Sequence, residues 1–214
     1  MCGCYELKAK TRALNRRFPQ LKLAQSSLPR NGEFHPTDQV LMITRSQSGF
    51  IGHSVRWGLV GNFLNRPPLN PLLTLPSEGL VSTPFYSKIL KRNRCLIPAT
   101  AFHECLLPNR KKQRVRMSAA NGELLVFAGI FDHHSQAGTT CAILTAATAA
   151  SVGPIKHALP VMLNHEQSSF WLGEHADFPE ADFVALLQAP SAYALTMETI
   201  VEAEPSPQLS LAFA

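Results

Sequence analysis

The chain has 214 residues, of which 45% are hydrophobic and 16% charged, a composition typical of a folded globular protein and not of a disordered one. Its formal net charge is +5, and its five cysteines are odd in number and scattered, which argues against a disulfide framework. No apolar run is long enough to span a membrane, and the basic N-terminus lacks the apolar core of a signal peptide. We therefore expect a monomeric cytoplasmic protein with one domain over residues 1–214 and a flexible tail from about residue 202.

The first third of the chain predicts one helix and two strands. The helix is expected over residues 8–18, where apolar residues recur at helical spacing and Pro19 ends the run. Buried strands are expected over residues 40–44 and 55–59. Residues 65–76 carry four prolines, which predicts an irregular loop packed over the surface.

The middle of the chain is rich in strand-like runs. In chain order we expect a helix over 85–91, strands over 94–97, 114–117, 124–131, 139–147 and 161–163, and helices over 166–172 and 182–188. The turn sequence Asn121-Gly122 predicts that the strands on either side of it form a hairpin. Crowded strands without a regular βαβ alternation indicate an α+β fold: a strongly bent, barrel-like, mostly antiparallel sheet flanked by helices.

The start of the chain reads Met1-Cys2-Gly3-Cys4. If Met1 is removed, Cys2 carries a free α-amine, which titrates near ~8, and a thiol, which titrates near ~8.5. Together these groups can trap an aldehyde as a Schiff base and then close a thiazolidine ring. On position alone, a terminal cysteine is more often an inert small residue or part of a frayed end. Cys-x-Cys without a second close Cys or His pair is a weak metal signal, so we expect no metal and no other cofactor.

Basic residues gather in three groups. They are residues 8–17, then Lys88, Lys91, Arg92 and Arg94, and then Arg110, Lys111, Lys112, Arg114 and Arg116. Such groups suit a polyphosphate backbone, although most charge runs are simply solvated surface. Their number favours nucleic acid as the partner.

Several short motifs together point to one family. They are, in order, Cys2-Gly3, Arg56-Trp57-Gly58-Leu59, residues 91–99 leading to Phe102-His103-Glu104, Phe127-Ala128-Gly129-Ile130, and residues 155–163. In this order and spacing, from Cys2 to about Trp171, the chain resembles the SOS-response-associated peptidase family, whose members process abasic sites in DNA. The resemblance implies a bent, barrel-like fold, self-removal of Met1 and a basic groove for single-stranded DNA. It also implies a thiazolidine crosslink between Cys2 and the sugar aldehyde of an abasic site, in a protein that joins the nucleoid when bound to DNA.

The resemblance also implies roles for individual residues. Glu104 stands at the family's active-site glutamate, and its apolar neighbours favour a partly buried carboxylate that exchanges protons during ring closure. To substrate binding we assign Arg56, Trp57, Thr74, Glu78, Lys91 and Arg92. One segment departs from the family, because the usual Asn-Ala-Arg-x-Glu falls on residues 74–78, where Pro76 removes the guanidinium expected to hold a phosphate.

The segment that usually carries the catalytic histidine also departs from the family. An ungapped alignment places Lys156 at the histidine position and His157 one residue later. Three accounts are open: His157 is redirected by a local backbone change, Lys156 takes over the proton transfer, or reversal of the crosslink is lost while Cys2 still reacts.

Three functions therefore compete. The first is capture of abasic sites in single-stranded DNA through Cys2, as part of the DNA damage response. The second is a divergent family member that binds nucleic acid without chemistry, and the third is an N-terminal cysteine peptidase. We rank the peptidase lowest, because no oxyanion-hole segment is recognisable in the sequence.

Overall fold

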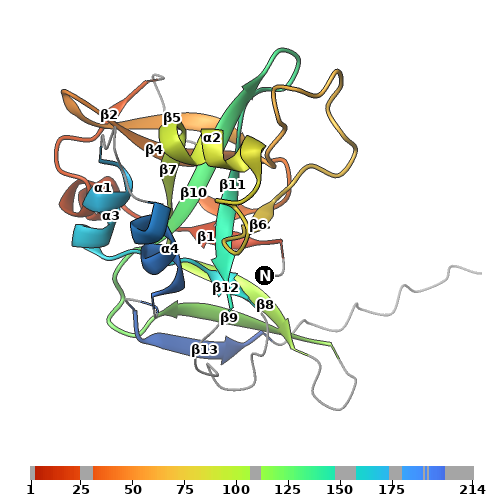
Figure 1. Cartoon of the computed structure of the whole chain (residues 1–214). Coiled ribbons are helices and arrows are strands. Elements are labelled where there is room, and N and C mark those ends of the chain that lie inside the picture. Colours follow the sequence, from red (N-terminus) through yellow and green to blue (C-terminus); the bar gives the residue numbers. More distant parts are fainter. Residues whose placement is uncertain are drawn as a thin grey trace, which may run out of the picture.

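Figure 1 shows the computed structural model of the chain. It describes residues 3–24, 31–106, 112–147, 158–173, 180–189, 191 and 193–200. The helices are α1 (Thr11–Arg17), α2 (Pro84–Arg92), α3 (His165–Trp171) and α4 (Glu180–Gln188). The strands are β1 (Tyr5–Leu7), β2 (Lys22–Leu23), β3 (Gly32–Phe34), β4 (Gln39–Ser46), β5 (Gly49–Trp57), β6 (Thr74–Pro76), β7 (Arg94–Ala99), β8 (Ala101–Leu106), β9 (Gln113–Ala119), β10 (Leu125–His134), β11 (Gly138–Ala146), β12 (Leu159–Pro160) and β13 (Leu195–Thr199). Within these described ranges, no helix is long and apolar enough to cross a membrane.

Five strands close into a barrel. The antiparallel pairs β5–β4, β4–β7, β7–β10 and β10–β11 follow one another around it. A parallel pairing between β11 and β5, with Cys141 opposite Trp57, completes the ring. Closure gives each of these strands a partner on both sides, which satisfies backbone groups that an open edge would leave exposed. The structure therefore confirms the predicted α+β fold with a bent, barrel-like, mostly antiparallel sheet.

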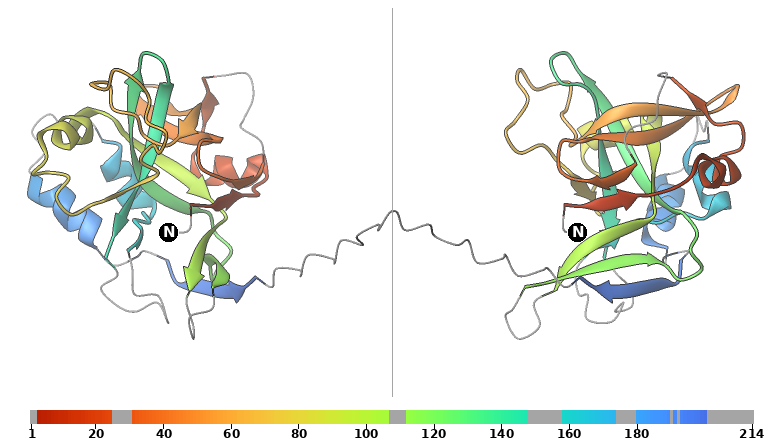
Figure 2. Two further views of the ribbon diagram at one scale, coloured as in Figure 1. Left: turned by 90° about the vertical axis from the view of Figure 1, so that its right-hand side faces the viewer. Right: turned by 180° about the vertical axis from the view of Figure 1, so that it is seen from behind.

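A second sheet carries the N-terminal strand. Its order is β13-β9-β8-β1-β3. The chain passes from the barrel into this sheet where β7 continues into β8, with a bend at Thr100, whose N–H donates to Glu6 O at 2.7 Å. In Figure 1, β8, β9 and β13 lie below the barrel, while α1, α3 and α4 lie together on its left. Figure 2 shows the same arrangement from the side and from behind.

Aromatic side chains join the two sheets. Tyr5 of β1 is completely buried and packs against the rings of Phe34, Trp57 and Phe127, with centroids 5.1–6.1 Å apart. Phe102 of β8 reaches the same Phe127 ring at 5.8 Å. Such edge-on and stacked contacts add to the stabilisation from burial. They fix β1 and β8, and therefore the start of the chain, against the barrel.

The predicted hairpin at Asn121-Gly122 is wrong. The turn itself forms, since Gly122 has a φ of +71° and donates its N–H to Ala119 O. However, β9 before the turn pairs with β8 and β13, whereas β10 after it pairs with β7 and β11. The turn therefore leads the chain from the second sheet into the barrel, and β9 and β10 each pair with other strands.

The predicted N-terminal helix is shorter than expected. It begins at Thr11 rather than at residue 8. The backbone N–H groups of Lys8 and Ala9 donate instead to side chains of other segments, so these two residues continue the extended path of β1. Tertiary hydrogen bonds therefore outweigh local helix propensity here.

Two other segments also differ from their predictions. The proline-rich loop over 65–76 ends in the short strand β6, which pairs in parallel with β11. The strand predicted over 161–163 lies two residues earlier, as β12, and Met162 forms only an isolated bridge to Phe127.

Candidate functional site

The N-terminal segment turns sharply at Gly3. Its φ of +38° lies in a region that residues with a side chain rarely adopt. A Cβ placed on Gly3 would lie 3.6 Å from Pro36 Cγ and 3.8 Å from Leu73 Cδ1. Gly3 therefore sits between the segment that follows β3 and the residue that precedes Thr74. The fold brings the residue after Cys2 to the start of β6.

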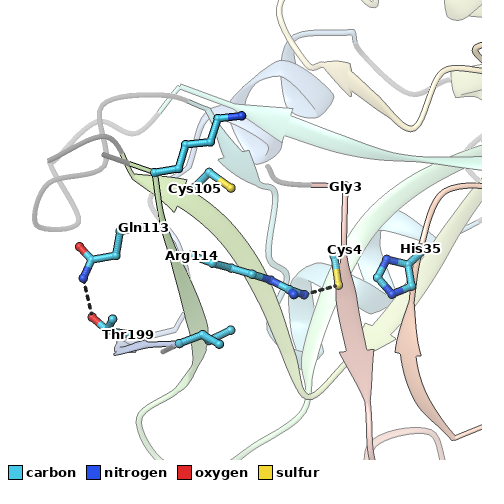
Figure 3. Close-up of a pocket in the computed structure, with 9 residues that line it drawn as sticks. Gly3, Cys4, His35, Cys105, Gln113, Arg114 and Thr199 are labelled. Atoms are coloured by element: carbon cyan, nitrogen blue, oxygen red, sulfur yellow. Dashed lines mark hydrogen bonds between the residues drawn. The ribbon is translucent and has the colours of Figure 1, made fainter. Parts of the chain in front are cut away.

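A pocket of about 490 Å³ opens beside this turn. It is lined by Gly3, Cys4, His35, Cys105, Lys112, Gln113, Arg114, Thr199 and Ile200. Figure 3 shows Arg114 reaching across the pocket toward Cys4. Gln113 and Thr199 join β9 to β13 at one side through a 3.3 Å hydrogen bond. Among the described residues that line it, Lys112 and Arg114 are permanent cations, and Arg114 is also paired with the Glu33 carboxylate beside the pocket. A pocket of this kind favours an anionic ligand.

Cys4 is anchored by charged neighbours. Its Sγ donates to Glu33 Oε1 at 3.0 Å, and Arg114 Nη2 contacts both Cys4 Sγ, at 3.2 Å, and Glu33 Oε1, at 2.5 Å. Burial and then the Glu33 carboxylate raise the pKa of Cys4 to about 12, with Arg114 opposing the shift. Cys4 is therefore a neutral thiol at physiological pH, suited to hold the chain in place and not to attack a substrate.

A buried hydrogen-bonded pair continues from this anchor. Glu6 and His103 are 3% and 2% exposed, and His103 Nε2 lies 2.8 Å from Glu6 Oε1. We assign the proton to Nε2, because the carboxylate can only accept, so Nδ1 can accept from Arg114, which it contacts. Arg116 donates to both oxygens of Glu6, from Nε to Oε1 at 3.1 Å and from Nη2 to Oε2 at 3.4 Å. We call Cys4, Glu6, Glu33, His103, Arg114 and Arg116 the polar cluster.

The polar cluster makes a testable contribution to stability at low pH. Burial of Glu6 opposes ionisation, but hydrogen bonds from His103, Arg116 and Lys8 outweigh it and lower the pKa of Glu6 from 4.5 to about 2. A lowered folded-state pKa stabilises the fold above pH 4.5, and this stabilisation is lost as the pH falls from about 4.5 toward 2. The loss corresponds to about 3 kcal/mol. Urea unfolding between pH 2.5 and 6 should show this slope in the wild type and a shallower one in Glu6→Gln. Equal slopes in the two proteins would contradict the assignment.

Glu104 lies on the opposite face of β8 from His103, because successive side chains of a strand point to opposite faces. It is 1% exposed and stands opposite Val115 of β9, so the expected burial of this carboxylate is confirmed. The preceding residue, His103, donates its N–H to Cys4 O at 3.0 Å. Glu104 is therefore carried on the strand that is bonded to the start of the chain.

The other predicted residues fall into two groups. Thr74 is half-buried and follows Leu73, the neighbour of Gly3. Trp57 does not line a surface as expected: it is completely buried, and its indole N–H donates to Leu73 O at 3.0 Å. It supports the segment that leads into Thr74 and offers no face to DNA.

The remaining cations and Glu78 do not line the pocket beside Cys4. Glu78, Lys91 and Arg92 are exposed, and Arg56 is half-buried on β5. Arg92 instead lines a separate groove with Phe63 and Phe85. The structure does not bring these side chains to the N-terminal turn.

Cys2, Lys156 and His157 lie outside the described residues. The described chain resumes at Ala158, directly before β12. β12 and β6 flank the same end of β11, where Thr145 stands opposite Pro160 on one side and Pro76 on the other. The segment of Thr74 and the segment that follows His157 therefore meet at one end of the barrel.

Comparison with known proteins decides the family. A family model described as "SOS response associated peptidase (SRAP)" matches residues 1–203. The chain belongs to the SOS response associated peptidase family. The matched residues include the N-terminal segment, the residues that line the pocket beside Cys4, and the buried Glu104.

Relatives of known name are distant in sequence. The chain is 25% identical to abasic site processing protein YoaM of Bacillus subtilis over 151 residues, which cover 68% of this chain and 66% of YoaM. It is 27% identical to abasic site processing protein YobE of the same organism over 161 residues, 70% of this chain and 74% of YobE.

Solved structures share the fold. A protein from Bacteroides thetaiotaomicron has a TM-score of 0.78 at 19% identity, covering 94% of this chain and 92% of its own. One from Bordetella bronchiseptica has a TM-score of 0.75 at 17% identity, covering 94% and 100%.

The sequence analysis missed the polar cluster. A signal was present, because Cys4 and Glu6 are two positions apart and so share one face of a strand, and the same holds for Arg114 and Arg116. What the pattern does not contain is the pairing of β1 with β3 and β8, which brings residues about 100 positions apart into contact.

Proposed function

We propose that this protein captures abasic sites in single-stranded DNA through Cys2 after removal of Met1. One observation carries the proposal: Gly3 and Cys4, the residues directly after Cys2, line a cationic pocket in the fold of a family whose named relatives are abasic site processing proteins. The proposed protein acts as a monomer and belongs to the DNA damage response.

The proposed chemistry uses both groups of Cys2. The α-amine attacks the aldehyde of the ring-opened sugar, and loss of one water gives a Schiff base. The thiol then adds to the imine carbon and its proton passes to the nitrogen, which closes the thiazolidine. The net reaction joins protein and DNA with the release of one water. Because Gly3 and Cys4 are held by Pro36, Glu33 and Arg114, the nucleophile is tethered close to a fixed point, which favours ring closure.

The cations of the pocket would hold the DNA. Lys112 and Arg114 lie beside the N-terminal turn, so a phosphate next to the abasic sugar is attracted there. Arg114 would replace part of the charge that Pro76 removes from the family's usual segment. We assign contacts further along the strand to Arg56, Thr74, Glu78, Lys91 and Arg92, which are exposed or half-buried.

We assign general acid–base catalysis to Glu104. Dehydration to the Schiff base needs a proton donor, and ring closure needs the proton returned, which one carboxyl can do. Glu104→Gln is expected to slow adduct formation about 100-fold, because the amide cannot exchange protons. Single-turnover rates on abasic oligonucleotide measure this effect. Glu166→Gln, at an exposed glutamate on α3, is the matched control and should react at the wild-type rate. Unchanged kinetics in Glu104→Gln would remove this residue from the mechanism.

Reversal of the crosslink is assigned to one of Lys156 and His157. The variants Lys156→Met and His157→Gln separate the two, since only the acting residue should slow the release of DNA from a preformed adduct. Release at the wild-type rate in both variants would contradict the assignment.

A second candidate function is binding of nucleic acid without chemistry. It is favoured by one observation, the exposed Pro76 in place of an arginine. A crosslinking assay separates the two functions. Purified protein is incubated with single-stranded oligonucleotide that does or does not contain an abasic site, then heated in denaturant. Capture predicts a heat-stable band only with the abasic oligonucleotide, whereas salt-sensitive binding without such a band would establish the second candidate.

A further inference from the structure

A second basic surface lies away from the pocket beside Cys4. It is a groove of about 650 Å³ between the end of β1, helix α1 and the turn that precedes β10. Its lining residues are Lys8, Ala9, Lys10, Arg12, Ala13, Arg16, Arg17, Thr100, Asn121, Gly122, Glu123, Leu124, Asn164, His165 and Tyr193. We call it the α1 groove. Five of these residues are permanent cations, and one, Glu123, is a carboxylate.

Two of the five cations are used inside the fold. Lys8 Nζ lies 3.0 Å from Glu6 Oε2. Arg17 Nη2 donates to Ser168 Oγ at 2.6 Å and to Leu163 O at 3.2 Å. The bonds of Arg17 tie α1 to α3, so one wall of the groove is fixed before any ligand arrives.

The other three cations have no such role. Lys10, Arg12 and Arg16 are exposed and form no ion pair with any residue in the described part of the chain. Arg12 and Arg16 stand one helical turn apart, where like charges destabilise a helix by about 0.2–0.5 kcal/mol. Helix α1 has no acidic residue in its first turn to offset them. Arg16 is in the last turn of α1, where the helix dipole favours a cation, but Arg12 is in the first turn, where the dipole disfavours one. An external anion would compensate Arg12 and the repulsion between the two side chains.

The α1 groove is connected to the proposed site of capture. β1 lies between Cys4, beside the pocket, and Lys8, at the groove. Figures 1 and 2 both show α1 beyond the end of β1 that is remote from the N-terminus. Four extended residues span about 13 Å at ~3.3 Å each. A stacked strand, at ~3.4 Å per nucleotide, covers that distance with about four nucleotides.

We propose that the α1 groove binds the phosphate backbone of the single strand that flanks the abasic site. This inference rests on the proposed function, and it names a second point of contact for the same DNA. Lys10, Arg12 and Arg16 provide the charge, while Arg17 holds the wall in place. The groove contributes affinity without base specificity, because its free cations recognise phosphate alone.

Anisotropy with intact oligonucleotide of about 20 nucleotides tests the groove without using the chemistry of Cys2. The variant Arg12→Gln/Arg16→Gln is compared with Lys22→Gln/Arg45→Gln, which removes the same charge from exposed residues outside the groove. Each lost phosphate contact lowers the slope of log binding constant against log salt concentration by ~0.7, so in Arg12→Gln/Arg16→Gln this slope should fall by about 1.4. The affinity of this variant for DNA at ~0.1 M salt should therefore be about 25-fold weaker than that of the wild type. An oligonucleotide with about two nucleotides on each side of the abasic site cannot reach the groove, so there the variant should match the wild type.

The outcomes separate this inference from the proposed function. Equal losses in both double variants, or none in Arg12→Gln/Arg16→Gln, overturn the groove and leave capture by Cys2 untouched. If Arg12→Gln/Arg16→Gln loses binding to phosphatidylserine vesicles but still binds DNA, the assignment of the α1 groove to DNA is overturned in favour of a membrane surface. A wild type that binds intact DNA through the groove but forms no adduct overturns the proposed function alone.

Discussion

Replacing Cys2 with alanine is expected to abolish the heat-stable adduct with abasic DNA. The variant keeps an N-terminal amine, so it still forms a Schiff base, but without the thiol no ring closes and the imine hydrolyses on heating. Borohydride added before heating should therefore restore a band in Cys2→Ala, because it reduces the imine to a stable amine. The measurement is the fraction of labelled DNA that is shifted on a denaturing gel, with and without borohydride.

Two other thiols serve as controls for Cys2. Cys105 is exposed and lines the same pocket, so Cys105→Ala tests whether any thiol near the DNA suffices. Cys4→Ala tests the anchor, whose thiol is neutral because burial raises its pKa to about 12. Both variants should retain the adduct. An adduct that survives in Cys2→Ala without borohydride, or disappears in Cys105→Ala, would contradict the assignment of the nucleophile.

Arg94→Met is expected to lower the free energy of unfolding by about 4 kcal/mol, the largest effect on stability that we predict. Arg94 is 9% exposed, and its guanidinium donates to Trp171 O, Leu90 O and Gly173 O at 2.5–2.6 Å. It also lies 4.9 Å from the centre of the Phe183 ring. Its Nη1 also donates to Lys91 O at 2.9 Å. This one side chain therefore joins β7 to the ends of α2 and α3 and to α4, and methionine leaves four carbonyls without their donor.

Arg94→Lys distinguishes charge from geometry. An ammonium cannot match the flat, five-donor guanidinium, so we expect lysine to recover about half of the loss. Urea unfolding followed by circular dichroism measures both variants. Arg66→Met, at an exposed arginine, should change stability by less than about 0.5 kcal/mol. A cost below about 1 kcal/mol for Arg94→Met would show that water or other donors replace the guanidinium.

The sequence predicted elements best where burial is uniform along a segment. The strand runs over 40–44 and 94–97 and the helix over 85–91 all lie within observed elements. The extent of β8, residues 101–106, is harder to predict, because His103 and Glu104 interrupt the apolar pattern. Both side chains are buried where β8 pairs with β9, the next strand, and with β1, which is about 95 positions away, and no local pattern contains the pairing with β1.

The candidate site was predictable in its chemistry and not in its surroundings. Cys2 and Glu104 follow from residue type and from the family resemblance. The anchoring of the N-terminal segment by Glu33 and Arg114 depends on the registers of β3 and β9, which are set by the whole fold. Trp57 was misplaced because a motif position does not specify which way a side chain points, and here it faces the core.

The central claim is that Cys2 closes a thiazolidine on the abasic sugar, and thiol counting on the intact adduct tests it most directly. The adduct is denatured and treated with maleimide, and its intact mass is measured by mass spectrometry. The account predicts the mass of protein plus DNA less Met1 and one water, with one reactive thiol fewer than the five cysteines of the free chain. An adduct that retains Met1, or one in which all five cysteines still react with maleimide, would contradict it.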